Sequence, residues 1–251
     1  MKKLLRENYK FIIFISVFGL IGGYFSGKYL LESYTPEILK EVIKQLGSKK
    51  MIVIVAMIQS MFYSLVLGIL GIHLSKKVNL WKKIYFNKNS FKNSVIFGII
   101  SGLLLILPDE FIFNKMSFNI AEIYKNKPSF NFIMSGITYG GVVEEILMRL
   151  FLMSLVALII RRIFYSKSRK IDDKIYIISN IIISVLFALG HLPNTAMTMG
   201  LSVWIIIRCM LLNIIFGLIF GYIYRKYGII YSILTHSLTH IVSKFIWLVF
   251  I

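Results

Sequence analysis

The sequence is short of cysteine, proline and acidic residues, which number one, four and eleven among 251, while 57% of its residues are hydrophobic. The single cysteine, Cys209, has no partner within the chain, so an internal disulfide framework is excluded. Charged residues make up 16% of the sequence, against roughly 25% in ordinary soluble domains. These shortages exclude a disulfide-rich secreted protein and a typical soluble domain, and they favour an integral membrane protein.

Long apolar runs recur along the whole chain. A helix needs ~20 mostly apolar residues to cross a hydrocarbon core of ~30 Å. The runs predict seven helices over residues 11–31, 51–74, 93–107, 130–160, 175–191, 202–224 and 229–251. Pro108 and Pro193 are expected to end the third and fifth helices, because proline lacks the backbone donor. We therefore expect an all-α, polytopic transmembrane bundle of about seven spans, forming one integral membrane domain over residues 1–251.

The basic residues are distributed unevenly between alternate loops. Four precede the first span, six lie in residues 75–92, six in 161–174 and two at 225–226, whereas the loops on the other side hold seven. Because Lys and Arg accumulate in cytoplasmic loops, the N-terminus is predicted to be cytoplasmic and the C-terminus external. We expect a multi-pass protein of a bacterial plasma membrane. The net charge of +18 does not indicate nucleic-acid binding, since no basic face or nucleic-acid-binding motif can be assembled.

Four basic residues lie within the apolar runs or at their ends. Lys28 and Lys244 are near predicted helix ends, where a long side chain can extend its ammonium to the interface. Arg208 lies deeper, and it is either the partner of a carboxylate in the bundle or an anchor for a substrate carboxylate. The fourth, Arg149, belongs to a charged motif.

This motif is the stretch "VVEEILMRLF", residues 142–151, which carries Glu144, Glu145 and Arg149. An ionisable residue at the membrane centre costs ~2.5 to 3.5 kcal/mol, so these side chains should be paired or face a wet cavity. Glu145 and Arg149 are separated by four residues and share a helix face, which predicts an ion pair. Glu144 points ~100° away and has less charge compensation, which suits a general base. The alternative is that all three only brace helix packing.

Three of the four histidines fall in the last helices. "FALGH" places Phe187 one turn before His191, and "HSLTH" places His236 and His240 one above the other on the last helix. These imidazoles and the two carboxylates come from three predicted helices. We expect them to converge on one polar pocket inside the membrane.

The order E-E-x-x-x-R, F-x-x-x-H and H-x-x-x-H, each in its own apolar helix, resembles the CAAX-protease and bacteriocin-processing (CPBP) family of intramembrane endopeptidases. This group is also called the Abi or Rce1-like family. The stretch "FGLIFGYIYRKYGIIYSILTH" before the last motif is similar to the family too. The likeness covers about residues 130–245, whereas the helices within residues 1–129 carry no family signature.

The resemblance implies hydrolysis of peptide bonds in a membrane cavity, with catalytic residues Glu144, His191, His236 and His240. Glu144 would activate water together with His191, while His236 and His240 would polarise the carbonyl or stabilise the oxyanion. Glu145, Arg149 and Phe187 would support the site. The family usually has Asn or Asp at the position of His240, so this chain departs from the family pattern there. The four catalytic side chains could also bind zinc, and both mechanisms stay open.

Two other classes of function also explain buried charges. A secondary transporter could use the Glu and His side chains as a proton relay, and a catalytically silent scaffold or immunity protein could retain them without turnover. The rhomboid, presenilin-type and site-2 protease motifs are absent from the sequence. We expect the lipid bilayer and a membrane-associated peptide or protein substrate as partners. A prenylated CAAX peptide, a pheromone or bacteriocin precursor and a membrane-protein regulator all remain candidates.

Overall fold

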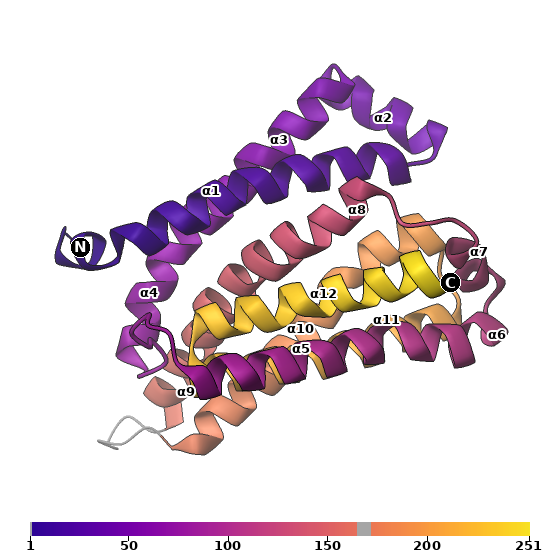
Figure 1. The fold of residues 1–251 in the computed structure, drawn as a ribbon. Coiled ribbons are helices and arrows are strands. Elements are labelled where there is room, and N and C mark those ends of the chain that lie inside the picture. The colour runs from indigo at the N-terminus through magenta and orange to yellow at the C-terminus, as the bar shows by residue number, and fades with distance from the viewer. Residues whose placement is uncertain (1, 165–171) are drawn as a thin grey trace.

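The computed structural model describes residues 2–164 and 172–251, which contain helices and no strand (Figure 1). Elements with a wider, π-helical turn carry the label η. The elements are α1 Lys2–Ser33, α2 Pro36–Leu46, α3 Lys49–Phe62, η1 Tyr63–Leu67, α4 Gly68–Lys77, α5 Lys88–Pro108, η2 Asp109–Phe113, α6 Asn114–Met116, α7 Phe118–Tyr124, α8 Phe130–Ser135, η3 Gly136–Glu144, η4 Ile146–Met153, α9 Ser154–Phe164, α10 Asp173–Met199, α11 Val203–Tyr227 and α12 Ile229–Phe250.

The predicted architecture of about seven spans is confirmed. Six helical segments are long and apolar enough to cross a membrane, over residues 2–33, 49–77, 88–116, 173–199, 203–227 and 229–250. The seventh, from α8 through η3 and η4 to α9, carries the charged motif. The spans are longer than the apolar runs indicated, because helix continues into the polar flanks. The protein is therefore an integral, multi-pass membrane protein.

The predictions that Pro108 and Pro193 end helices are wrong. The helix that contains Pro108 continues through η2 and α6, and α10 continues past Pro193 to Met199. Proline has a helical φ and removes one backbone hydrogen bond, so a helix held by neighbours on both sides can continue through it. The widened turn of η2 directly follows Pro108. The fifth span ends instead at Gly200, whose φ of 70° ends the helical path.

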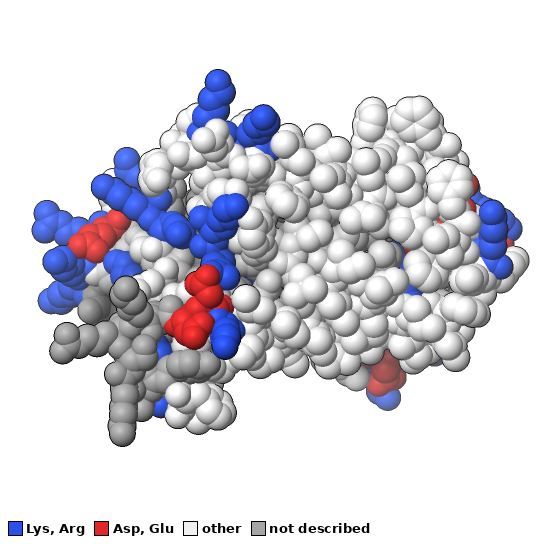
Figure 2. All heavy atoms as spheres, turned by 90° about the horizontal axis from the view of Figure 1, so that it is seen from below, with Lys and Arg blue, Asp and Glu red and all other residues white. Residues whose placement is uncertain are grey.

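Charge separates the two ends of the bundle. Figure 2 shows lysines and arginines gathered at one end, with fewer at the other and an almost uncharged band between them. The basic end holds the start of α1, the end of α4 and the end of α9. Three basic residues counted in the predicted loop 161–174 lie outside the described residues: Lys167, Arg169 and Lys170. We call the two ends the basic end and the opposite end; the band between them fits a membrane.

The helix α1 is one of the elements through which the first half of the chain packs against residues 130–245. Gly19, Gly23 and Gly27 form a stripe along α1 that faces α3 and η1. A Cβ on Gly23 would lie 2.5 Å from the backbone oxygen of Ala56, so only glycine permits this approach. Small residues let helix backbones come close in a membrane, where packing rather than hydrophobic burial drives association. The other side of α1 contacts α8 and η3, which places its far end beside the site.

The last helix starts inside the protein, which sets the depth of its histidines. The turn before α12 is at Gly228, with φ of 102°, and a Cβ there would lie 2.9 Å from Cβ of Lys82. The amide of Asn87 donates to the hydroxyl of Tyr231 at 2.7 Å. Residues 80–87 thus cover the start of α12 from the basic end. His236, two turns further along, consequently reaches the middle of the bundle.

Candidate active site

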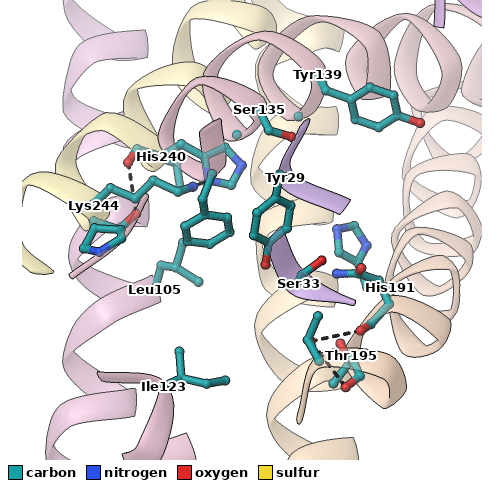
Figure 3. A pocket seen from close by; sticks show the side chains of 18 of the residues that line it. Tyr29, Ser33, Leu105, Ile123, Ser135, Tyr139, His191, Thr195, His240 and Lys244 are labelled. Carbon is teal, nitrogen blue, oxygen red and sulfur yellow. Dashed lines mark hydrogen bonds between the residues drawn. The ribbon is translucent and has the colours of Figure 1, made fainter. Parts of the chain in front are cut away.

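A cavity of about 790 Å³ opens among α1, α5, η3, α10, α11 and α12. Glu144 from η3, His191 from α10, and His236 and His240 from α12 all line it. Figure 3 shows His191 and His240 among the lining side chains. The four residues predicted as catalytic therefore face one space.

His191 is held by its own helix. Its Nδ1 lies 2.8 Å from the backbone oxygen of Phe187, and the Phe187 ring packs edge-on against the imidazole with centroids 4.5 Å apart. A carbonyl oxygen only accepts, so Nδ1 carries the proton in this bond. A neutral His191 then has a lone pair on Nε2 and can accept a proton or orient a water.

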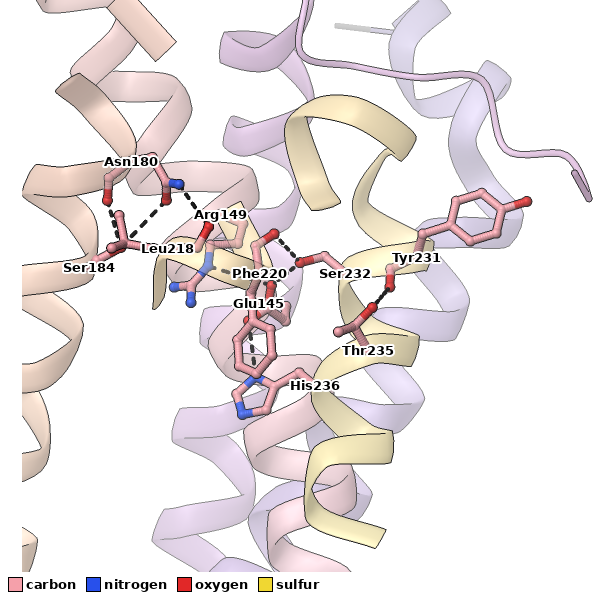
Figure 4. Close-up of polar contacts among 10 residues, drawn as sticks. All are labelled: Glu145, Arg149, Asn180, Ser184, Leu218, Phe220, Tyr231, Ser232, Thr235 and His236. Atoms are coloured by element: carbon pink, nitrogen blue, oxygen red, sulfur yellow. Dashed lines mark hydrogen bonds and ion pairs between the residues drawn. The ribbon is translucent and has the colours of Figure 1, made fainter. Parts of the chain in front are cut away.

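His236 is held by Glu145, which lies behind it rather than in the cavity (Figure 4). Nδ1 of His236 is 2.9 Å from Oε1 of Glu145, and the Ser232 hydroxyl is 2.5 Å from the other carboxylate oxygen. The Phe220 ring stacks on His236 with centroids 4.3 Å apart. The carboxylate fixes the ring and stabilises it when it is protonated, as a carboxylate does behind a catalytic histidine.

Arg149 completes this network as a fully buried cation. Its Nε lies 3.6 Å from Oε2 of Glu145, so the ion pair predicted from their spacing is present. That distance is too long for a hydrogen bond, and no described residue accepts one from the guanidinium nitrogens. The guanidinium instead lies 4.8 Å from the ring centroid of Phe187 and 5.7 Å from that of Phe220. Charge and aromatic faces together compensate its desolvation.

Lys244 differs from the prediction. We expected its ammonium to reach the membrane interface, but the residue is 5% exposed and lines the cavity. Its Nζ lies 2.9 Å from Nδ1 of His240, one turn earlier on α12, and 4.4 Å from the ring centroid of Phe132. The imidazole acceptor and the aromatic face replace water around the ammonium, so the side chain has no need to extend outward. The spacing of four residues between His240 and Lys244 is the one feature of the sequence that indicates this contact.

Arg208 is the partner of a carboxylate, which decides between the two alternatives for this residue. Its Nε donates to Oδ1 of the fully buried Asp109 at 2.6 Å, and Nη2 donates to Oδ2. The Tyr124 hydroxyl donates to the same carboxylate at 2.5 Å. Burial, together with the charge on Asp109, raises the pKa of Tyr124 and keeps it a donor. This cluster connects η2, α7 and α11 beside the cavity.

The geometry does not fit a zinc site. Among residues 2–164 and 172–251, no three His, Cys, Asp or Glu side chains are placed to hold a metal ion together. His240 also has an ammonium at its Nδ1, and a second cation beside it would be repelled. We therefore derive no catalytic step through a metal.

The cavity opens toward the opposite end of the bundle. Its lining includes the last turns of α1 from Ser26 to Ser33, residues 126–129 between α7 and α8, and α10 from Phe187 onward. Near this mouth, Glu32 of α1 accepts hydrogen bonds from Ser129 and Asn131, each at 2.5 Å. The side toward the basic end is filled by a packed apolar core that includes the fully buried Ile146, Leu150 and Met153.

Removing the arginine should destabilise the fold. We expect Arg149→Ala to lower the free energy of unfolding by ~3 to 5 kcal/mol, because Glu145 would remain buried without its cation. Thermal unfolding in detergent measures this effect, with the exposed Arg162→Ala as the matched control. The double variant Glu145→Gln, Arg149→Met should lose less than Arg149→Ala. Equal melting temperatures for Arg149→Ala and Arg162→Ala would refute the role of the ion pair.

Comparison with known proteins supports the resemblance that the motifs carry. The family model described as "Type II CAAX prenyl endopeptidase Rce1-like" matches residues 125–242, which include both glutamates of the charged motif and His191, His236 and His240. No curated protein and no solved structure matches the chain significantly. Residues 125–242, just under half of the chain, are therefore similar to the Rce1-like family of type II CAAX prenyl endopeptidases.

Proposed function

We propose that this protein hydrolyses peptide bonds of membrane-associated substrates, with Glu144 as the general base that activates water. One observation carries the proposal: four side chains, Glu144 of η3, His191 of α10 and the two histidines of α12, line a single cavity inside the bundle. The family supports a protease in general terms. The assignment of each residue rests on the hydrogen bonds around it.

The proposed reaction begins with a water molecule between Glu144 and His191. Glu144 takes a proton from the water, the lone pair on Nε2 of His191 orients it, and the water oxygen attacks the carbonyl carbon. The resulting oxyanion is stabilised by Nε2–H of His240 and by Nε2–H of His236 in its doubly protonated form. The proton then passes to the amide nitrogen, the C–N bond breaks, and the products are a carboxylate and an amine.

The surroundings of the cavity support this chemistry. Fixed donors act more strongly where bulk water is scarce, and the apolar core excludes water on the side toward the basic end. The Glu145 carboxylate holds His236 and compensates the positive charge of the ring when both of its nitrogens carry protons. Glu144 has no comparable partner among the described hydrogen bonds, so its carboxylate is left available to the water.

The direction in which the cavity opens indicates where substrates come from. The basic end is cytoplasmic by the distribution of Lys and Arg, so the mouth at the opposite end faces away from the cytoplasm. The proposed substrates are therefore peptides or membrane-protein segments presented at the outer face of a bacterial plasma membrane. This favours exported peptide precursors and membrane-protein regulators over CAAX peptides that are prenylated in the cytoplasm.

The transporter alternative has less support. Alternating access needs a route from the central site to both sides of the membrane. The packed core formed by Ile146, Leu150, Met153 and their neighbours closes the route toward the basic end. A silent scaffold would have the same geometry, and a measurement of turnover distinguishes it from a protease.

Two substitutions test the catalytic assignment. We expect Glu144→Gln and His191→Ala to reduce cleavage by at least ~10²-fold, since each removes a group acting on the water. Cleavage is measured in proteoliposomes with two fluorogenic probes, a farnesylated peptide ending in a CAAX sequence and an unprenylated membrane-anchored peptide. The exposed Glu41→Gln on α2 is the matched carboxylate control. Full turnover by Glu144→Gln would disprove the assignment of the base.

Metal analysis tests the non-metal mechanism. We expect active, purified protein to contain far less than one zinc per chain and to keep its activity after treatment with a chelator, because no ligand set is present in the described residues. Elemental analysis and cleavage assays on the same sample give both values. Loss of activity on chelation with recovery on adding zinc would contradict this mechanism.

Cysteine labelling tests the side on which the cavity opens. In a Cys209→Ser background, a membrane-impermeant maleimide should label Asn126→Cys at the mouth in intact cells. Asn89→Cys, exposed at the start of α5 on the basic end, should react only after the cells are permeabilised. The reverse pattern would place the mouth in the cytoplasm and overturn the proposed source of substrates.

A further inference from the structure

The pair formed by His240 and Lys244 has a property that neither of the other two histidines shares. His191 and His236 each use Nδ1 to contact an oxygen, a backbone carbonyl and a carboxylate respectively. His240 uses Nδ1 to contact an ammonium. An oxygen acceptor requires a proton on Nδ1, whereas an ammonium, which has donors only, requires a lone pair there.

We propose that Lys244 is a positioning residue that holds His240 in the tautomer with the proton on Nε2, so that His240 donates a hydrogen bond to the oxyanion of the scissile carbonyl. A neutral imidazole carries one N–H, and the Lys244 contact at Nδ1 places it on Nε2. This inference rests on the proposed peptidase function. It assigns a role to a lysine that lies two residues beyond the segment matched by the family model.

Burial disfavours a charged Lys244, but two neighbouring groups favour the charged form and hence this direction of the hydrogen bond. Its Nζ lies over the face of Phe132 at 4.4 Å from the ring centroid, and a ring face attracts a cation. A neutral amine could instead accept a proton from Nδ1, but it would lose this attraction. Glu144, on the helix that follows α8, lines the same cavity and adds a negative charge.

Two glycines of η3 make the space that the pair occupies. A Cβ on Gly136 would collide with Nζ of Lys244 and lie 3.1 Å from Nδ1 of His240. A Cβ on Gly140 would lie 2.8 Å from Nε2 of His240. The Nε2 atom therefore lies against Gly140, and Glu144 follows one turn later on the same helix. A donor at Nε2 is thus close to the helix that carries the general base, where the reacting carbonyl has to bind.

The pair also accounts for an unusual residue at position 240. The family resemblance implies Asn or Asp there, and the amide of Asn offers an N–H donor without any choice of tautomer. Histidine offers a donor at Nε2 in only one of its two neutral tautomers. Lys244 removes that ambiguity, so the two residues together supply what a single Asn would.

A double-mutant cycle tests the inference through kcat. We expect Lys244→Met to lower kcat about tenfold with little change in KM. Without the lysine, His240 would carry its proton on Nε2 only part of the time. The loss should therefore be smaller than the ~10²-fold to 10³-fold loss that follows complete removal of an oxyanion donor. Lys244→Gln keeps a donor to Nδ1 and should retain most of the activity. In a His240→Asn background, Lys244→Met should have no further effect. Lys28→Met on α1, outside the cavity lining, is the lysine control.

An equal loss from Lys244→Met in the His240 and His240→Asn backgrounds would overturn the inference, because the lysine would then act on something other than the tautomer. Unchanged kcat in Lys244→Met would overturn it as well. These outcomes are read only from variants that keep the melting temperature of the wild type.

Nitrogen NMR tests the same inference without turnover. In ¹⁵N-histidine-labelled protein at neutral pH, we expect His240, assigned by its absence from the His240→Asn spectrum, to carry its proton on Nε2. A proton on Nδ1, or on both nitrogens, would overturn the proposal even if the Lys244 variants do not fold. Because this measurement needs no substrate, its result is independent of the proposed peptidase activity.

Discussion

The burial of Arg149 is the constraint on which the rest of the site depends. A guanidinium with no exposed surface is tolerable in a membrane bundle only if charge and polarisable surfaces surround it. Glu145 supplies the charge, and Phe187 and Phe220 supply two ring faces. The same three residues also contact the histidines, since Glu145 bonds His236, Phe187 packs on His191 and Phe220 stacks on His236. Stabilising the arginine thus fixes the imidazoles.

This arrangement divides the two adjacent glutamates into separate roles. Glu145 faces the interior network and is occupied by Arg149, His236 and Ser232. Glu144 is rotated on the helix and lines the cavity. Neighbouring carboxylates in one motif therefore meet different environments, one compensated by protein groups and one open to water. Such a difference allows one of them to act as a base while the other remains a structural anion.

The sequence predicted those parts of the site that depend on local helix geometry. Spacing of four residues identified the Glu145–Arg149 pair, and apolar runs identified the seven spans, because both follow from the period and rise of a helix. The sequence alone does not predict contacts between segments that lie far apart in the chain. Asp109, the partner of Arg208, lies 99 residues away in the chain, and the covering of α12 by residues 80–87 depends on how the spans assemble. The prediction that Lys244 reaches the membrane interface was wrong because the depth of this residue depends on where α12 begins.

The central claim is that Glu144 and the histidines share a water-filled cavity within the membrane. The most direct test is an experimental structure of the protein in a lipid nanodisc, at a resolution that shows ordered water. The account predicts a water within hydrogen-bonding distance of both the Glu144 carboxylate and Nε2 of His191. A Glu144 side chain turned toward lipid, or too far from His191 to share a water with it, would contradict the account.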